Sequence, residues 1–213
     1  MEMTHADYDR LYQLLNVTAN FDPKFEIPYL LGGLILGESP SHAREAIRFL
    51  ERGKAHFPAD WRFPSYVGYT YYFSLGNAEA AGRSMAEAAR LPGTPVYMAG
   101  LASRMLSEAR NPAAALSMLK TIAQQERDST RRAVLERRIR EVAVERDLQM
   151  LEQAVETYRG KTGVYPAKLE DLVRERILAA IPVEPNGGKY LVMQGGKVRS
   201  DRVAQRLRVF RSQ

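Results

Sequence analysis

The three histidines, His5, His42 and His56, are the side chains best suited to metal binding or proton transfer near neutral pH. They lie far apart in the sequence, and none occurs in the H-E-x-x-H spacing of a zinc enzyme. His42 falls in an expected turn between helices, where we expect it to be solvated. The chain has no cysteine, which excludes disulfides, thiolate catalysis and thiolate metal sites. The sequence therefore predicts no metal site and no cofactor.

Two short motifs approach ligand-binding or catalytic signatures without completing them. "PNGGK" lacks the first glycine of a phosphate-binding loop, where Val183 stands, and no Ser or Thr follows Lys189. "GESPS" carries Ser41 where a nucleophile elbow needs its last glycine. The neighbouring acids Glu170 and Asp171 lie beside basic residues of an expected helix surface, which is typical of solvated ion pairs. We therefore predict no catalytic residues, no enzymatic activity and no small-molecule substrate.

An internal repeat of 35 residues organises the first half of the chain. Its two clearest copies are "YLLGGLILGESPSHAREAIRFLERGKAHFPADW" and "SYVGYTYYFSLGNAEAAGRSMAEAARLPG". One period separates Gly33 from Gly68, Ala46 from Ala81, Leu50 from Met85 and Gly53 from Ala88. A third, less regular copy places Ser103, Ala115 and Leu119 in the same roles. The pattern predicts helical hairpins that stack around a continuous core.

This pattern resembles tetratricopeptide repeats, which pair antiparallel helices with glycine in the first helix and alanine in the second. The resemblance divides residues 1–126 into a half repeat at 8–23 and repeats at about 26–58, 61–92 and 95–125. It implies a mainly α fold, a short tetratricopeptide-like α-solenoid with an extended concave face. Another array of helical hairpins is the alternative, and its physical consequences would be nearly the same.

In such arrays the first helix of each hairpin lines the concave face, and tyrosines near arginines suit peptide binding there. Aromatic rings supply rigid apolar area with a polar tip. The predicted partner-binding residues are Arg62, Tyr66, Tyr69, Tyr72, Phe73, Tyr97, Arg104 and Glu108. Leu30 and Leu34 would lie at equivalent depth in the preceding repeat. The alternative for each tyrosine is packing between helices.

A long amphipathic helix is expected at residues 127–159, capped by Ser129 or Thr130. Its apolar stripe consists of Leu135, Ile139, Val142, Leu148, Leu151, Val155 and Tyr158. Gly160 and Gly163 are expected to stop it. We expect the stripe to pack on the last repeat.

Residues 160–213 break from the helical pattern. A short helix is expected from Pro166, with an apolar face of Leu169, Leu172, Val173, Ile177 and Leu178. The proline-rich "IPVEPNGG" excludes a helix or a central strand. "KYLVM" and "KVRS" predict a β-hairpin through Gly195 and Gly196, because glycine tolerates positive φ. The final "DRVAQRLRVFRSQ" is a basic amphipathic stretch or a loose tail.

From about Leu148 to Ser200 the chain resembles the globular part of type II secretion major pseudopilins. The residues that carry this resemblance are Tyr158, Gly163, Tyr165, Pro166, Leu169, Leu172, Pro182, Pro185, Gly187, Gly188 and Tyr190. Several departures stand beside it. Glu184 stands where aspartate is usual, and Asn186 stands where a large aromatic residue is common. The apolar N-terminal helix of pseudopilins and an acidic cluster that could bind calcium are both missing. The resemblance implies a small α+β cap, or alternatively a surface for envelope partners.

The net charge of +6 is placed unevenly. Residues 1–125 hold 12 Lys/Arg and 12 Asp/Glu, whereas residues 126–213 hold 19 and 13. We expect a protein or peptide partner for a binding scaffold, in envelope assembly or secretion. The alternatives are nucleic-acid or anionic-membrane binding through the basic C-terminal half, and self-association into a homo-oligomer.

The start, "MEMTHADYDR", has neither the basic nor the apolar region of a signal peptide. The longest apolar run, Ile27 to Leu36, is too short to cross a bilayer. We therefore expect a soluble chain. The bacterial repeat proteins that the whole chain resembles carry a membrane anchor, which favours a periplasmic body anchored upstream of Met1; a cytoplasmic protein is the alternative.

Overall fold

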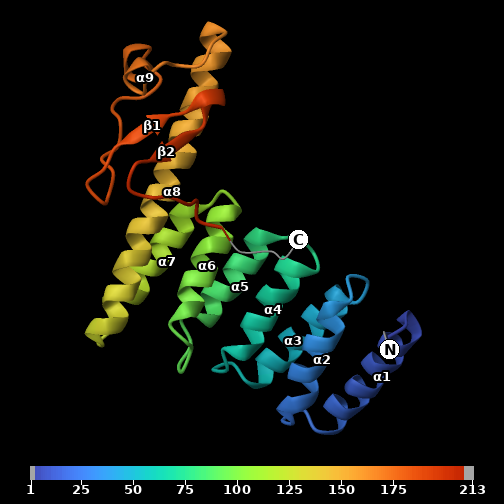
Figure 1. Cartoon of the computed structure of the whole chain (residues 1–213). Helices are drawn as coiled ribbons and strands as arrows, with labels where there is room; N and C mark the ends of the chain where they lie inside the picture. The colour runs from blue at the N-terminus through green and yellow to red at the C-terminus, as the bar shows by residue number, and fades with distance from the viewer. Residues whose placement is uncertain (1–2, 209–213) are drawn as a thin grey trace. The chain divides into compact units, whose positions relative to one another are not determined.

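A computed structural model describes residues 3–208 (Figure 1). The chain divides into two compact units, Met1–Ala109 and Arg110–Gln213, each described by itself. The described residues form nine α-helices and one two-stranded antiparallel sheet near the C-terminal end. The predictions of a mainly helical protein and of a C-terminal β-hairpin are therefore confirmed.

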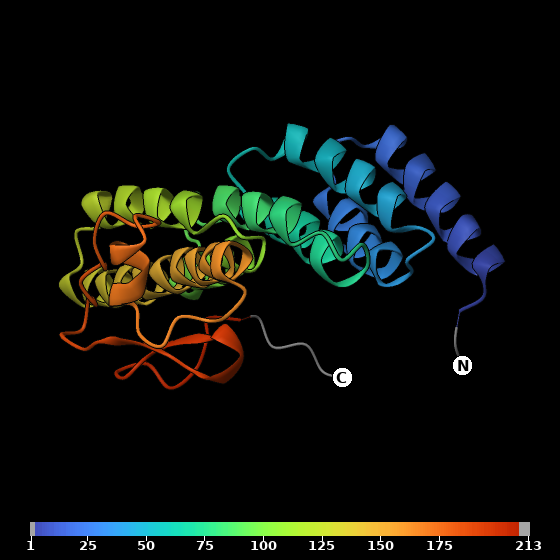
Figure 2. The same ribbon diagram turned by 90° about the horizontal axis from the view of Figure 1, so that it is seen from above.

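Six consecutive helices make up the first unit. They are α1 (His5–Phe21), α2 (Glu26–Glu38), α3 (Ala43–His56), α4 (Arg62–Phe73), α5 (Ala78–Ala88) and α6 (Tyr97–Glu108). Each helix packs against the next, and α2 also packs against α4 (Figure 2). The hairpins expected at 26–58 and 61–92 correspond to α2–α3 and α4–α5, and the half repeat corresponds to α1.

Glycines provide the close helix crossings in both repeats. A Cβ atom added to Gly33 would lie 2.3 Å from Leu50 Cδ2, and one added to Gly68 would lie 2.8 Å from Met85 Cγ. These pairs are one period apart in the sequence, so the same small-to-large contact recurs at equivalent places in α2–α3 and α4–α5. The equivalence of these positions, predicted from the 35-residue spacing, is confirmed.

The second unit contains α7 (Pro112–Gln125), α8 (Ser129–Thr162), α9 (Glu170–Arg174), β1 (Tyr190–Val192), the 3₁₀ helix η1 (Gln194–Gly196) and β2 (Val198–Ser200). Helix α7 packs against α8, and α8 also contacts α9, η1 and β2. The two strands pair antiparallel, with Leu191 opposite Arg199. The third predicted repeat, 95–125, thus runs across the division between the units.

Helix α8 differs from its prediction at both ends. Asp128 is the N-cap, because its side chain accepts a 2.8 Å hydrogen bond from the Arg131 backbone N–H. The expectation that Ser129 or Thr130 caps the helix is therefore wrong. The helix continues through Gly160 and ends at Gly163, which has a φ of 81°. A glycine inside a helix costs only about 1 kcal/mol, whereas a left-handed residue at a helix end favours glycine strongly.

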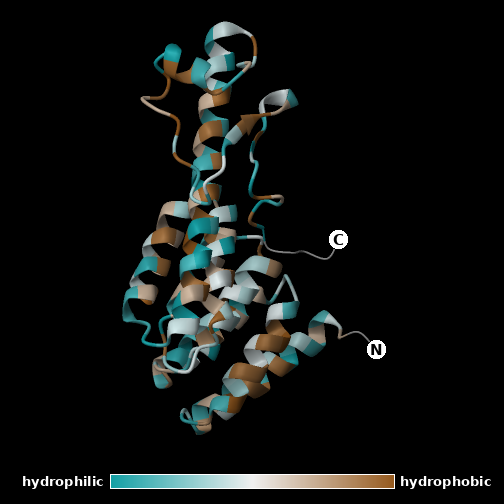
Figure 3. Ribbon diagram, turned by 60° about the vertical axis from the view of Figure 1, so that its left-hand side comes forward, coloured by the Kyte–Doolittle hydropathy of each residue, from teal (hydrophilic) through white to brown (hydrophobic). Residues whose placement is uncertain are grey.

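The core of the second unit lies between α8 and the C-terminal segments. The predicted apolar stripe supplies Leu148, Leu151 and Val155, which pack with Leu172 and Tyr190. Figure 3 shows apolar and polar residues alternating along α8. The predicted short helix is reduced to α9, because the Asp171 carboxylate accepts hydrogen bonds from the Ala167 and Lys168 N–H groups and holds the preceding segment in a turn.

None of the helices between residues 3 and 208 combines the length and the apolar character needed to cross a bilayer. The most apolar helix, α2, has 13 residues. A membrane-spanning helix needs about 20.

Candidate functional site

Exposed aromatic rings lie on α4 and at the start of α6 in the first unit. Tyr69, Phe73 and Tyr97 are 41%, 49% and 62% exposed, and we call these three residues the aromatic face. The ring centroids of Tyr69 and Phe73 lie 4.5 Å apart, as expected for side chains four residues apart on a helix. Leu31 and Leu34 of α2 are also exposed, and Leu34 precedes Tyr69 by one repeat period.

Two of the predicted partner-binding tyrosines lie elsewhere. Tyr72 is only 1% exposed, and its hydroxyl donates a 2.7 Å hydrogen bond to Glu108, so the prediction that it lines an exposed surface is wrong. The physical reason is helical phase, because Tyr72 follows Gly68 by four residues and shares its face toward α5. Tyr66 is half-buried and packs against the core of the first unit.

The two predicted partner-binding arginines, Arg62 and Arg104, differ in their hydrogen bonds. Arg62 donates hydrogen bonds to Asp60 and Glu26 at 2.6 and 2.9 Å. The bonds to Asp60, and then the charge of Glu26, raise the pKa of Arg62 despite partial burial. Arg104 differs, because its buried Nε has no hydrogen-bond partner among the described residues. Arg62 thus helps fix the start of α4.

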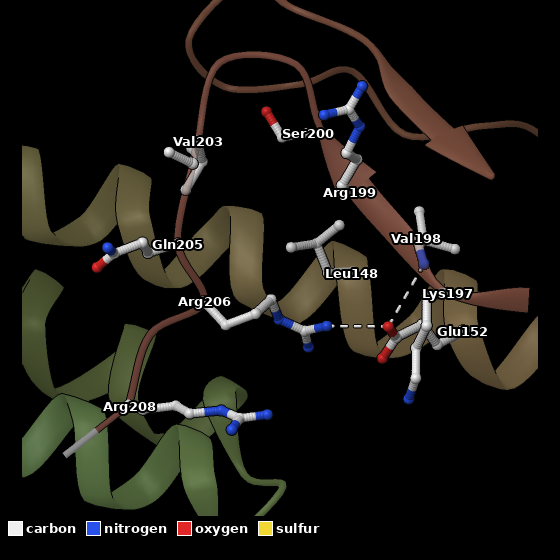
Figure 4. Close-up of a pocket in the computed structure, with 11 residues that line it drawn as sticks. Leu148, Glu152, Lys197, Val198, Arg199, Ser200, Val203, Gln205, Arg206 and Arg208 are labelled. Atoms are coloured by element: carbon white, nitrogen blue, oxygen red, sulfur yellow. Dashed lines mark hydrogen bonds and ion pairs between the residues drawn. The ribbon is translucent and has the colours of Figure 1, made fainter. Parts of the chain in front are cut away.

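A pocket of about 270 Å³ lies in the second unit between α8, β2 and the chain that follows it (Figure 4). Arg206 crosses its wall and donates hydrogen bonds to Glu145 at 2.7 and 2.8 Å and to Glu152 at 2.9 Å. These contacts raise the pKa of Arg206, with the Glu145 hydrogen bonds contributing most. Lys197, Arg199 and Arg208 also line the pocket. None of these three side chains forms an ion pair within residues 3–208.

Buried carboxylates in the second unit are satisfied by hydrogen bonds. Glu184 accepts bonds from the Asn186 and Gly188 N–H groups at 2.6 and 3.0 Å, and from the Ser200 hydroxyl at 3.1 Å. Burial acts to raise the pKa of Glu184, but these bonds together outweigh it and lower the pKa. Glu184 is therefore an ionised acceptor that shapes the "PNGG" turn.

The expectation that His42 is solvated is wrong. His42 is 2% exposed, and its Nε2 lies 3.1 Å from Asp9 Oδ1, while His5 is nearby on the same helix as Asp9. The packing of α1 on α2 brings these residues together across more than 30 positions. No local spacing in the sequence signals such a contact, so it could not be found from the sequence.

Comparison of the chain with family models, with curated proteins and with solved structures gave no match. The tetratricopeptide and pseudopilin resemblances therefore remain predictions based on the residues named above. Function is accordingly inferred from the surfaces and charges of the two units.

Proposed function

We propose that the protein is a non-enzymatic scaffold whose first unit binds a peptide or protein segment across the aromatic face. The observation that carries this proposal is the exposure of Tyr69 and Phe73 on α4 and of Tyr97 on α6. Grouped exposed apolar side chains on soluble proteins commonly mark interaction sites, and tyrosine is enriched among residues that dominate binding.

The side chains around the aromatic face indicate the chemistry of the partner. Leu31 and Leu34 add aliphatic area on α2, which favours a segment with apolar anchors. In this proposal α2, α4 and α6 line the concave side of a short tetratricopeptide-like solenoid, and the second unit carries the pseudopilin-like part. Envelope assembly or secretion is the process that this resemblance favours.

Selection from a displayed peptide library tests the proposal even though the partner is unidentified. Peptides selected on the wild-type chain are expected to bind the Tyr69→Ala, Phe73→Ala double variant at least tenfold more weakly. A matched control is Val183→Ala, an exposed apolar residue of the second unit. Circular dichroism establishes that each variant is folded. Equal affinity of the double variant for every selected peptide would show that the aromatic face is not the binding site.

The basic pocket of the second unit favours a second candidate function, the binding of nucleic acid or of an anionic membrane. Lys197, Arg199 and Arg208 gather at one pocket with no acidic partner among the described residues. Such binding would weaken steeply with salt. A salt titration with duplex DNA and with acidic vesicles tests this function, and absence of binding to both at low salt would reject it.

Self-association is a third candidate, favoured by α1. Leu14, Val17 and Phe21 follow each other at spacings of three and four and are strongly exposed. An apolar stripe of this kind pairs readily with a second copy. Sedimentation analysis that finds only monomer at high protein concentration would exclude it.

A further inference from the structure

Three side chains of types that can bind a metal ion lie close together in the first unit. His5 and Asp9 lie one turn apart at the start of α1, and His42 is the residue immediately before α3. One ligand atom from each side chain lies within 4.8 Å of the other two. His42 is almost completely buried, whereas His5 and Asp9 are exposed, so one ligand is fixed and two can adjust.

Two serine hydroxyls orient the imidazoles. His42 Nδ1 lies 3.0 Å from Ser39 Oγ and 3.1 Å from Ser41 Oγ, and His5 Nδ1 lies 3.4 Å from Ser41 Oγ. The Nε2 atoms of both rings therefore face Asp9, at 3.1 Å for His42 and 4.0 Å for His5. Metal-binding histidines in proteins are oriented in this way, by a hydrogen bond to the ring nitrogen that does not bind the metal.

The hydroxyls also permit the change of tautomer that metal binding requires. When His42 Nε2–H donates to Asp9, Nδ1 accepts a hydrogen from a serine. When Nε2 binds a metal, Nδ1 carries the proton and donates it to the same hydroxyl, because a serine oxygen can act as donor or acceptor. The buried His42 can thus exchange its proton at Nε2 for a cation without losing its Nδ1 partner.

We propose that His5, Asp9 and His42 bind a divalent transition metal, with Zn²⁺ the ion that two imidazole nitrogens and one carboxylate oxygen suit best. Tetrahedral zinc holds its ligand atoms about 3.3 Å apart, given metal–ligand bonds of about 2.0–2.1 Å. The observed separations reach this range when the exposed His5 and Asp9 side chains close toward His42. Three protein ligands leave a fourth position for water.

A metal at this place would fasten α1 to the turn that joins α2 and α3. Because the ligands come from segments more than 30 residues apart, the bound ion stabilises the folded chain and not the unfolded one. The site is separate from the aromatic face, since it uses none of its residues. The scaffold proposal and the metal proposal therefore succeed or fail independently.

Titration of the untagged full chain with Zn²⁺ in a calorimeter tests the site. We expect one Zn²⁺ per chain, a rise in melting temperature on metal addition, and visible Co²⁺ absorption bands of four-coordinate intensity. His5→Ala and Asp9→Asn are expected to weaken Zn²⁺ binding at least tenfold without unfolding the chain, since both residues are exposed. His42→Ala should do the same, but its burial makes the two exposed variants the decisive ones.

His56→Ala is the matched control, because His56 is the remaining histidine and lies at the far end of α3. It is expected to leave Zn²⁺ affinity unchanged. The absence of stoichiometric Zn²⁺ binding by the wild-type chain would overturn the proposal. So would wild-type affinity in both His5→Ala and Asp9→Asn, since the metal would then be bound elsewhere.

Discussion

The Tyr190 hydroxyl donates a 2.9 Å hydrogen bond to the buried carboxylate of Asp147. This bond joins β1 to the middle of α8, where Asp147 also accepts a 2.7 Å bond from Arg146. Burial, and then the bond to Asp147, raise the pKa of Tyr190, so the phenol stays protonated and remains a donor. One buried polar contact thus links β1 to α8 within an otherwise apolar core.

Tyr190→Phe should destabilise the second unit, because Asp147 then loses a donor while remaining buried. We expect a loss of about 1–3 kcal/mol in the free energy of unfolding. Urea unfolding followed by circular dichroism measures this loss. Leu191→Ala, an exposed position on the same strand, is the control and should change little. Unchanged stability of Tyr190→Phe would mean that a water replaces the hydroxyl.

Leu172→Ala should lower the melting temperature clearly. Leu172 is fully buried against α8, and removing a buried leucine side chain costs about 2–5 kcal/mol. Val164→Ala, at an exposed position nearby, should melt like the wild type.

Truncation before Gly160 removes the C-terminal segments that cover Leu148, Leu151 and Val155, so we expect a poorly soluble or partly unfolded protein. A truncated chain that melts unchanged would show that residues 160–213 are an independent module.

Two glycine-to-alanine changes in the second unit should have opposite signs. Gly196 has a φ of 75°, and a Cβ there would lie 2.3 Å from the Tyr165 ring, so Gly196→Ala should destabilise the hairpin. Gly160 lies inside α8 with no neighbour within 4 Å of an added Cβ, so Gly160→Ala should stabilise it by about 0.5–1 kcal/mol. Thermal unfolding of both variants measures the difference, and equal shifts would contradict the described backbone at Gly196.

Glu184 should make stability depend on pH in the acid range. Because the folded protein lowers the pKa of this carboxyl from its ordinary 4.5, its contribution is complete above that value and is lost as the pH falls through the folded pKa. Glu184→Gln cannot titrate, so the stability difference between wild type and variant should shrink as the pH drops below 4.5. Urea unfolding at a series of pH values tests this, and a constant difference down to pH values of about 2 would refute it.

The sequence predicted the elements that depend on periodic spacing. The repeat of Gly33 and Gly68, the apolar stripe of α8 and the glycine hairpin all lie where their local patterns placed them. The end of α8 was less well predicted, because Gly160 and Gly163 are both glycines and differ only in backbone conformation. Tyr72 was misplaced because its phase on α4, four residues from Gly68, was misread. His42 was misplaced for another reason, because its burial depends on a contact with Asp9, which is distant in the sequence. Spacing alone carries no information about such contacts.

The most direct test of the scaffold proposal is site-specific photo-cross-linking in the cells that produce the protein. A benzophenone amino acid would replace Phe73 or Tyr97 of the aromatic face, with Val183 as the exposed position outside it. We predict a discrete cross-linked protein partner at positions 73 and 97, lost when Tyr69→Ala is added, and no such product at position 183. Cross-linking that is absent at 73 and 97, or equal at all three positions, would contradict the proposal that this face binds a partner.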